Sequence, residues 1–172
     1  MTGRGAMGDD QGFEQFYRTT RHRVVTVLYA LCGDLTDAQD ASQEAYVRAW
    51  QRWDKLSAYD DPEAWVRSVG HRLLLNRLRK VRNGLRAYRR HGLSGPADPP
   101  SDDVVALVAA LRQLPEEQRL AIVLHHLADL PVAQVAAQLD VPVNTVKARL
   151  ARGRRALADL VGVSLREETT HA

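Results

Sequence analysis

Apolar residues recur at helical spacing through most of this 172-residue chain, and the alternation expected of a half-buried strand is scarce. In the first run, Phe13, Phe16, Val24 and Leu31 fall at helical spacing, and Gly33 is placed to end the helix. The same kind of pattern returns several times further along the chain. We therefore predict an all-α protein.

Two further helices are indicated in the first half of the chain. Thr36–Gln39 has the form of a capping box and predicts the start of a second helix, which runs to about Trp53. Asp61-Pro62 then supplies an N-cap and a first helical residue for a third helix, which reaches about Arg82. We expect Trp50 and Trp53 to lie in the core.

The stretch from residue 84 to residue 103 interrupts this pattern. It is rich in Gly, Pro and Ser and has no sustained apolar period, which is typical of a linker. Helical patterns resume at Val104 and continue through short helices that open near Pro115 and Pro131. The sequence predicts two small helical domains, residues 1–83 and 104–172, joined by a flexible linker.

The charges are unevenly distributed, although the formal net charge is only +3. Residues 64–97 contain nine Lys or Arg and no acid, and residues 141–157 contain five and no acid. Two basic stretches separated by acidic ones favour two contacts with a polyanion and at least one different partner. For either stretch alone, a solvated helix face is an equal alternative.

Residues 131–157 have the form of a helix-turn-helix. Val135 and Val146 stand where the two helices must pack, Ala136 is small where they cross, and Asp140 can adopt the left-handed backbone of the turn. Asn144 can cap the last helix, whose first half would reach base edges in a major groove. A plain helical hairpin with a basic face is the alternative. The residues that we predict to contact DNA are Asn144, Thr145, Lys147, Ala148, Arg149, Ala151, Arg152, Arg154 and Arg155.

Three blocks of the chain resemble the extracytoplasmic-function (ECF) sigma factors of the sigma-70 family. Residues 33–53 resemble the conserved second region of that family, residues 61–82 the reader of the promoter −10 element, and residues 111–157 the fourth region, which reads the −35 element. The resemblance covers about Phe13–Arg82 and Val104–Leu160 and is closest to the short SigE-like group. It implies a two-domain sigma factor.

An acidic face is predicted on the second helix, because Asp37, Asp40, Glu44 and Arg48 follow one another at spacings of three and four, with Gln43 beside Asp40. The resemblance implies that this face docks on the clamp helices of the polymerase β′ subunit. Taken alone, the pattern would describe a solvated helix face.

The resemblance also implies that the third helix and the loop before it, Lys55–Asp60, handle the −10 element, with the loop holding a base flipped out of the duplex. Tyr59 would either stack on such a base or belong to a small core. Arg72 stands where many relatives carry Asn. The loop residues assigned to this role are Leu56, Ser57, Ala58, Tyr59 and Asp60. On the outer face of the third helix we assign to it Arg67, His71, Arg72, Asn76 and Arg79.

Several other classes of function find little support. No apolar run is long enough to span a membrane and no secretory signal is seen, so a cytoplasmic protein is expected. Cys32 is the one cysteine and is read as a buried, inert thiol. His125-His126 lacks a third ligand at a suitable spacing, and no nucleophile motif or phosphate loop is present. We expect neither a metal, nor a cofactor, nor catalysis.

The leading hypothesis is a sigma factor that binds core RNA polymerase, through the β′ clamp helices and the β flap, and reads promoter DNA with both domains. An anti-sigma partner is left open. The runner-up is a helix-turn-helix regulator that does not bind polymerase and whose N-terminal half dimerises or senses a ligand. A third class is an RNA-binding adaptor that uses the Arg-rich third helix.

Overall fold

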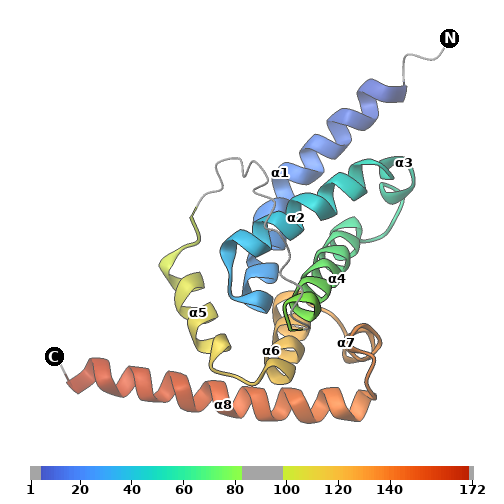
Figure 1. The fold of residues 1–172 in the computed structure, drawn as a ribbon. Helices are drawn as coiled ribbons and strands as arrows, with labels where there is room; N and C mark the ends of the chain where they lie inside the picture. The colour runs from blue at the N-terminus through green and yellow to red at the C-terminus, as the bar shows by residue number, and fades with distance from the viewer. Residues whose placement is uncertain (1–4, 83–98, 171–172) are drawn as a thin grey trace. The chain divides into compact units, whose positions relative to one another are not determined.

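The computed structural model describes residues 5–82 and 99–170, and all regular structure in these ranges is helical (Figure 1). The chain divides into two compact units, Met1–Pro99 and Pro100–Ala172. Most of the predicted linker, residues 84–98, lies outside the described residues. The prediction of an all-α fold is confirmed.

The first unit contains α1 (Gly5–Cys32), α2 (Leu35–Trp50), the single turn α3 (Trp53–Leu56) and α4 (Pro62–Arg82). Helices α1, α2 and α4 all pack against one another. The side of α2 that faces the other two helices carries Ala38, Ala41, Ala45 and Ala49, all fully buried. Alanines permit a close approach of helices, so the larger core residues come from α1 and α4, among them Val24, Leu28, Val66 and Leu74.

In the turn between α1 and α2, the predicted end of α1 is confirmed and the predicted N-cap of α2 is not. Gly33 has a φ of 71°, and its amide donates to the carbonyl of Tyr29 at 2.7 Å, so it ends α1. The prediction that Thr36 caps α2 is wrong. Asp34 is the N-cap, because its extended backbone lets its carboxylate accept the amide of Asp37 at 2.9 Å.

The tryptophans near the end of α2 also differ from expectation. The helix ends at Trp50, and the chain turns before α3 begins at Trp53. Trp53 is 9% exposed and stacks on Phe16 with ring centroids 4.9 Å apart, as a core residue should. Trp50 is 56% exposed, so its assignment to the core is wrong. It follows Ala49 by one residue and therefore points away from the alanine stripe of α2.

Helix α4 begins as the sequence predicts. The Asp61 carboxylate accepts the amide of Ala64 at 2.8 Å, and Pro62 is the first helical residue. Further along, Gly70 lies so close to α1 that a Cβ atom there would be 2.7 Å from Cδ1 of Leu28. This contact brings α4 and α1 together at the centre of the unit.

The second unit contains α5 (Asp102–Arg112), α6 (Glu116–Ile122), the π-helical turn η1 (Val123–Leu127), α7 (Val132–Leu139) and α8 (Val143–Thr170). Helix α8 packs against α5, α6 and α7. Val108, Leu111, Val123 and Val135 are buried in the core of this unit.

Helices α7 and α8 form the predicted helix-turn-helix. Asp140 adopts a left-handed backbone, with φ 53°, and ends α7, as the sequence predicts. The prediction that Asn144 caps α8 is wrong. The helix already begins at Val143, and the amides of Thr145 and Val146 bond to the Pro142 carbonyl, so Asn144 lies inside the first turn. No helix in the described part of the chain is both long and apolar enough to cross a bilayer.

Candidate nucleic-acid and partner interfaces

Helix α8 turns a basic surface outward. Val146 and Leu150 are buried, and Gly153 lies so close to α6 that a Cβ atom there would be 2.9 Å from Cγ1 of Ile122. This contact fixes which side of α8 faces the unit. Among the residues that the sequence assigns to DNA, Thr145 and Ala148 are half-buried. The exposed members are Asn144, Lys147, Ala151, Arg152, Arg154 and Arg155.

Arg149 differs from this group. Its side chain is 16% exposed, and its guanidinium lies 3.1 Å from the carboxylate of Glu117 on α6. The expectation that Arg149 points outward is therefore wrong. Its charge is therefore already paired within the unit.

The outer face of α4 holds fewer of the predicted residues than expected. Arg72 and Asn76 are exposed, while the side chain of Arg79 lies outside the described residues. His71 is 3% exposed, so the prediction that it faces outward is wrong. It lies next to Gly70 and three residues before Leu74, both buried. Burial, and then the charge of Arg72, lower the pKa of His71 to about 4.

Arg67 is also turned inward, contrary to the sequence-based prediction. Its side chain is 15% exposed and lies between two carboxylates, at 2.7 Å from Glu63 and 3.5 Å from Asp61. Glu63 in turn accepts two hydrogen bonds from Arg23 on α1, at 2.6 and 3.2 Å. The bond to Glu63 raises the pKa of Arg23. These four side chains form one network at the start of α4.

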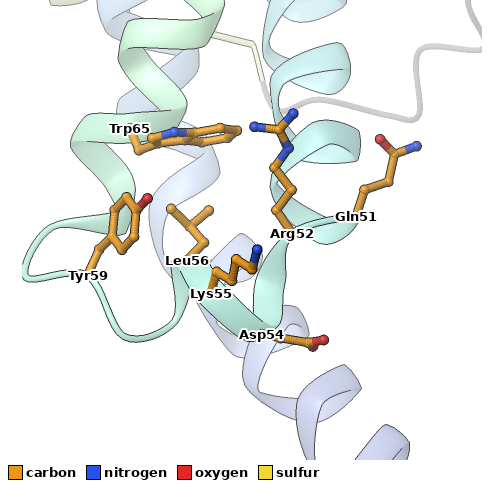
Figure 2. A pocket seen from close by; sticks show the side chains of 7 residues that line it. All are labelled: Gln51, Arg52, Asp54, Lys55, Leu56, Tyr59 and Trp65. Atoms are coloured by element: carbon orange, nitrogen blue, oxygen red, sulfur yellow. The ribbon is translucent and has the colours of Figure 1, made fainter.

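A pocket of about 410 Å³ opens where the α2–α3 turn and α3 face the start of α4 (Figure 2). The rings of Tyr59 and Trp65 lie on one side of it, with Arg52 and Lys55 across from them and Leu56 between. Aromatic rings give a base something to stack on, and the cations can attract a phosphate backbone. The lining residues are Gln51, Arg52, Asp54, Lys55, Leu56, Tyr59 and Trp65.

The pocket revises the predicted −10 loop. Leu56 belongs to α3 and is 2% exposed, so its placement in an open loop is wrong, and it forms apolar lining. Ser57, Ala58 and Asp60 are exposed. Tyr59 is 54% exposed, which removes the reading of it as a core aromatic.

Sequence reasoning missed four of the lining residues. Gln51 and Arg52 fall within the predicted second helix, Asp54 follows its predicted end, and Trp65 has no predicted role. The mixture of Trp, Arg, Asp and Lys in residues 50–55 is an unusual end for an amphipathic helix. It was the one available signal that this segment does more than pack.

The acidic face predicted on α2 is present. Asp37, Asp40 and Gln43 are partly exposed. Glu44 lies 2.6 Å from Arg48 on the same helix and 3.8 Å from Arg77 on α4. The face also has an apolar part that the sequence did not suggest. Val47 and Trp50, three and six residues after Glu44, are 52% and 56% exposed.

His125 and Cys32, the other reactive side chains considered in the sequence, are engaged in contacts within the fold. His125 shares a hydrogen bond of 2.8 Å between Nδ1 and the Leu130 carbonyl. In the described part of the chain, no three His, Cys, Asp or Glu side chains are grouped as metal ligands would be. Cys32 is partly buried, and burial raises the pKa of its thiol to about 11, which suits the inert role predicted for it.

Two family models match the chain, one in each unit. The model described as sigma-70 region 2 matches residues 16–84, and the model described as sigma-70, region 4 matches residues 105–157. Together they cover well over half of the chain. The first match spans the acidic face, the pocket and α4, and the second spans α5 to the middle of α8.

Individual relatives agree with these matches. The chain is 27% identical to the ECF RNA polymerase sigma factor SigW of Bacillus subtilis, over 87% of this chain and 89% of that protein. It is 28% identical to the ECF sigma factor SigK of Mycobacterium tuberculosis, over 94% and 92%. The solved sigma factor RpoE of Bartonella quintana, in complex with the anti-sigma factor NepR, matches with a TM-score of 0.69 and 22% identity, over 89% of this chain and 98% of that one. The last likeness supports the fold.

Proposed function

Because this chain belongs to the ECF group of the sigma-70 family, we propose that it binds core RNA polymerase and directs it to promoters by reading the −35 element and opening the −10 element. The observation that carries the proposal is the pocket at the start of α4, which combines aromatic rings with two cations. Arg72 and Asn76 are exposed further along the same helix. A duplex-binding regulator has no need of a pocket for an unpaired base.

The second unit would read the −35 element. Helix α8 presents Lys147, Arg152, Arg154 and Arg155 to solvent, and its buried side is fixed against α6 and α7. A helix held in this way can enter a major groove with its N-terminal half near the base edges. Arg149, paired with Glu117, is a secondary contact at most.

The first unit would hold the opened −10 strand. A flipped base loses a few kcal/mol of stacking, and a pocket with rings to stack on and cations near the backbone can offset this cost. Tyr59 and Trp65 offer the rings, and Arg52 and Lys55 offer the cations (Figure 2). Arg72 and Asn76 on the exposed side of α4 would meet the neighbouring nucleotides.

The acidic face of α2 would dock on core polymerase. A docking site needs apolar contact area in addition to charge, because exposed charged pairs contribute little affinity of their own. Val47 and Trp50 supply that area beside Asp40 and Glu44. We also propose an anti-sigma factor as a partner, since the solved RpoE structure contains its anti-sigma factor NepR.

The test is transcription in vitro with core polymerase and a DNA fragment from upstream of the protein's own gene. We expect a specific start that depends on this chain. Asp40→Arg and Glu44→Arg should abolish both the start and polymerase binding, while binding of the −35 duplex by α8 persists. Glu14→Arg, which reverses an exposed charge on α1, is the matched control and should change neither.

Two outcomes would contradict the proposal. If Asp40→Arg and Glu44→Arg bound polymerase as the wild type does, the acidic face would not be the docking site, and the alternative of a helix-turn-helix regulator would be favoured. If RNA of equal charge bound as tightly as the promoter duplex at the same salt concentration, the protein would be an RNA adaptor.

A further inference from the structure

The ion-pair network at the start of α4 is largely enclosed, which is unusual for a surface that contacts nucleic acid. Glu63 and Arg67 are one helical turn apart, and their side chains are only 14% and 15% exposed. Each has a second partner, because Glu63 also holds Arg23 of α1 and Arg67 also lies 3.5 Å from Asp61. A guanidinium enclosed in this way is poorly placed to meet a phosphate.

Asp61 connects the network to the backbone. One of its carboxylate oxygens accepts the amide of Ala64, and the other faces Arg67. The first oxygen caps α4, and the second is held in place by the guanidinium. The position of Arg67 therefore bears directly on how the chain enters α4.

The entry to α4 is also one wall of the pocket. The segment from Ser57 to Asp61 runs from α3 to the cap, and Tyr59 lies in its middle. Trp65 follows Ala64 in the first turn of the helix and lines the same pocket. A shift at Asp61 would move both Tyr59, two residues before it, and Trp65, four residues after it, and both rings line the pocket (Figure 2).

Stability alone explains this network poorly. In the described part of the chain, Nε of Arg67 is buried and has no hydrogen-bond partner. Enclosing a guanidinium is costly, and a buried ion pair often adds no more stability than apolar residues of similar volume would. An ion-pair network that adds little stability but fixes the positions of its side chains is suited to holding the neighbouring pocket in shape.

We propose that Arg67 is a positioning residue for the −10 pocket: it holds Asp61, and through Asp61 the segment that carries Tyr59 and the turn that carries Trp65. The inference rests on the proposed function, and it assigns Arg67 a role through other residues in place of the direct DNA contact that its charge suggests. Glu63 and Arg23 complete the support by tying the same turn to α1.

The two roles of an arginine differ in their response to salt. An arginine that touches a phosphate of a single strand contributes about 0.7 to the slope of log affinity against log salt concentration. A positioning residue contributes affinity without changing that slope. Arg72, exposed on the same helix, is the matched comparison for direct contact.

The experiment uses the full chain with core polymerase and the promoter fragment that supports a specific start. Opening is followed by the fluorescence of 2-aminopurine placed at each −10 position in turn, and affinity is measured for the −10 single strand over a range of salt concentrations. The variants are Arg67→Met, Arg67→Lys, Asp61→Asn and Arg72→Met. Asparagine at position 61 keeps an acceptor for the α4 cap and removes the charge that faces Arg67.

We expect Arg67→Met to lower opening by about tenfold, with an unchanged salt slope and unchanged −35 binding, and Arg67→Lys to recover part of the loss. Arg72→Met should reduce the slope by about 0.7. Asp61→Asn should lower opening by about threefold, and because it keeps the cap it provides a folded test even if Arg67→Met unfolds the unit.

Two results would overturn the inference. One is a salt slope that falls in Arg67→Met as it does in Arg72→Met, and the other is normal opening in Asp61→Asn. Both are distinct from a failure of the proposed function, in which the wild-type chain itself would give no specific start and no 2-aminopurine signal.

Discussion

The carboxylate of Glu117, at the start of α6, lies 3.1 Å from the guanidinium of Arg149 in the recognition helix α8. Glu117 is 71% exposed, so it stands as a negative charge at the edge of the surface that would meet DNA phosphates. We predict that Glu117→Gln tightens −35 duplex binding by about two- to fivefold, because it removes repulsion and frees Arg149. Fluorescence anisotropy with a labelled duplex measures this change.

The matched control for this substitution is Glu14→Gln, which removes an exposed ion pair with Arg18 on α1, in the other unit. It should leave −35 affinity unchanged. Weaker binding by Glu117→Gln would contradict the prediction and would mean that Glu117 holds Arg149 in the pose that contacts DNA. Neither change should alter the free energy of unfolding by more than about 1 kcal/mol.

Arg152 offers the simplest test of the orientation of α8. It is exposed, one residue before the buried Gly153. We predict that Arg152→Ala weakens −35 binding by about 1–3 kcal/mol if the side chain reads a base, or lowers the salt slope by about 1 if it meets a phosphate. The melting temperature should stay within a few degrees of that of the wild type. A large fall in melting temperature would show that this side of the helix is packed.

Much of the fold was predictable because its signals are local. The cap at Asp61, the left-handed Asp140 and the buried positions Val135 and Val146 each depend on a few neighbouring residues. The errors arise where one local signal competes with another. Thr36 and Asp34 are both acceptable N-caps, and only the backbone at Asp34 decides between them.

The candidate site was less predictable, because its parts come from different elements. Arg149 is held inward by Glu117 of another helix, α6, and Arg67 belongs to a network that reaches Arg23 of α1 through Glu63. The pocket needed the helix break after Trp50, since a continuous helix would carry Arg52 and Lys55 past the start of α4. Periodicity within one helix cannot reveal such a meeting of elements.

Gly153 and Gly12 are both helical glycines in different surroundings, and they should respond oppositely to alanine. A Cβ at Gly153 would be 2.9 Å from Cγ1 of Ile122, so Gly153→Ala should destabilise the second unit by about 1–3 kcal/mol through overpacking. A Cβ at Gly12 would be 3.5 Å from Nε1 of Trp53, an ordinary contact. Gly12→Ala should therefore stabilise by about 0.5–1 kcal/mol through helix propensity. Urea unfolding of each variant tests the pair, and equal effects of the same sign would contradict the packing of α8 on α6.

His71 should make the first unit sensitive to acid. Burial lowers its pKa from 6.5 to about 4, and its Nε2 has no partner among the described residues, so the folded unit holds it neutral. Between pH 6.5 and 4 the unfolded chain takes up a proton that the folded unit refuses. The free energy of unfolding of the first unit is therefore highest above pH 6.5. It decreases by about 3 kcal/mol as the pH falls to 4. Urea unfolding at several pH values should show the free energy of unfolding of His71→Met rising relative to that of the wild type as the pH falls. The control is His22→Gln, which removes an exposed imidazole on α1 and should follow the wild type at each pH. A difference between His71→Met and the wild type that did not change with pH would mean that the buried imidazole is protonated in the folded unit as readily as in the unfolded chain.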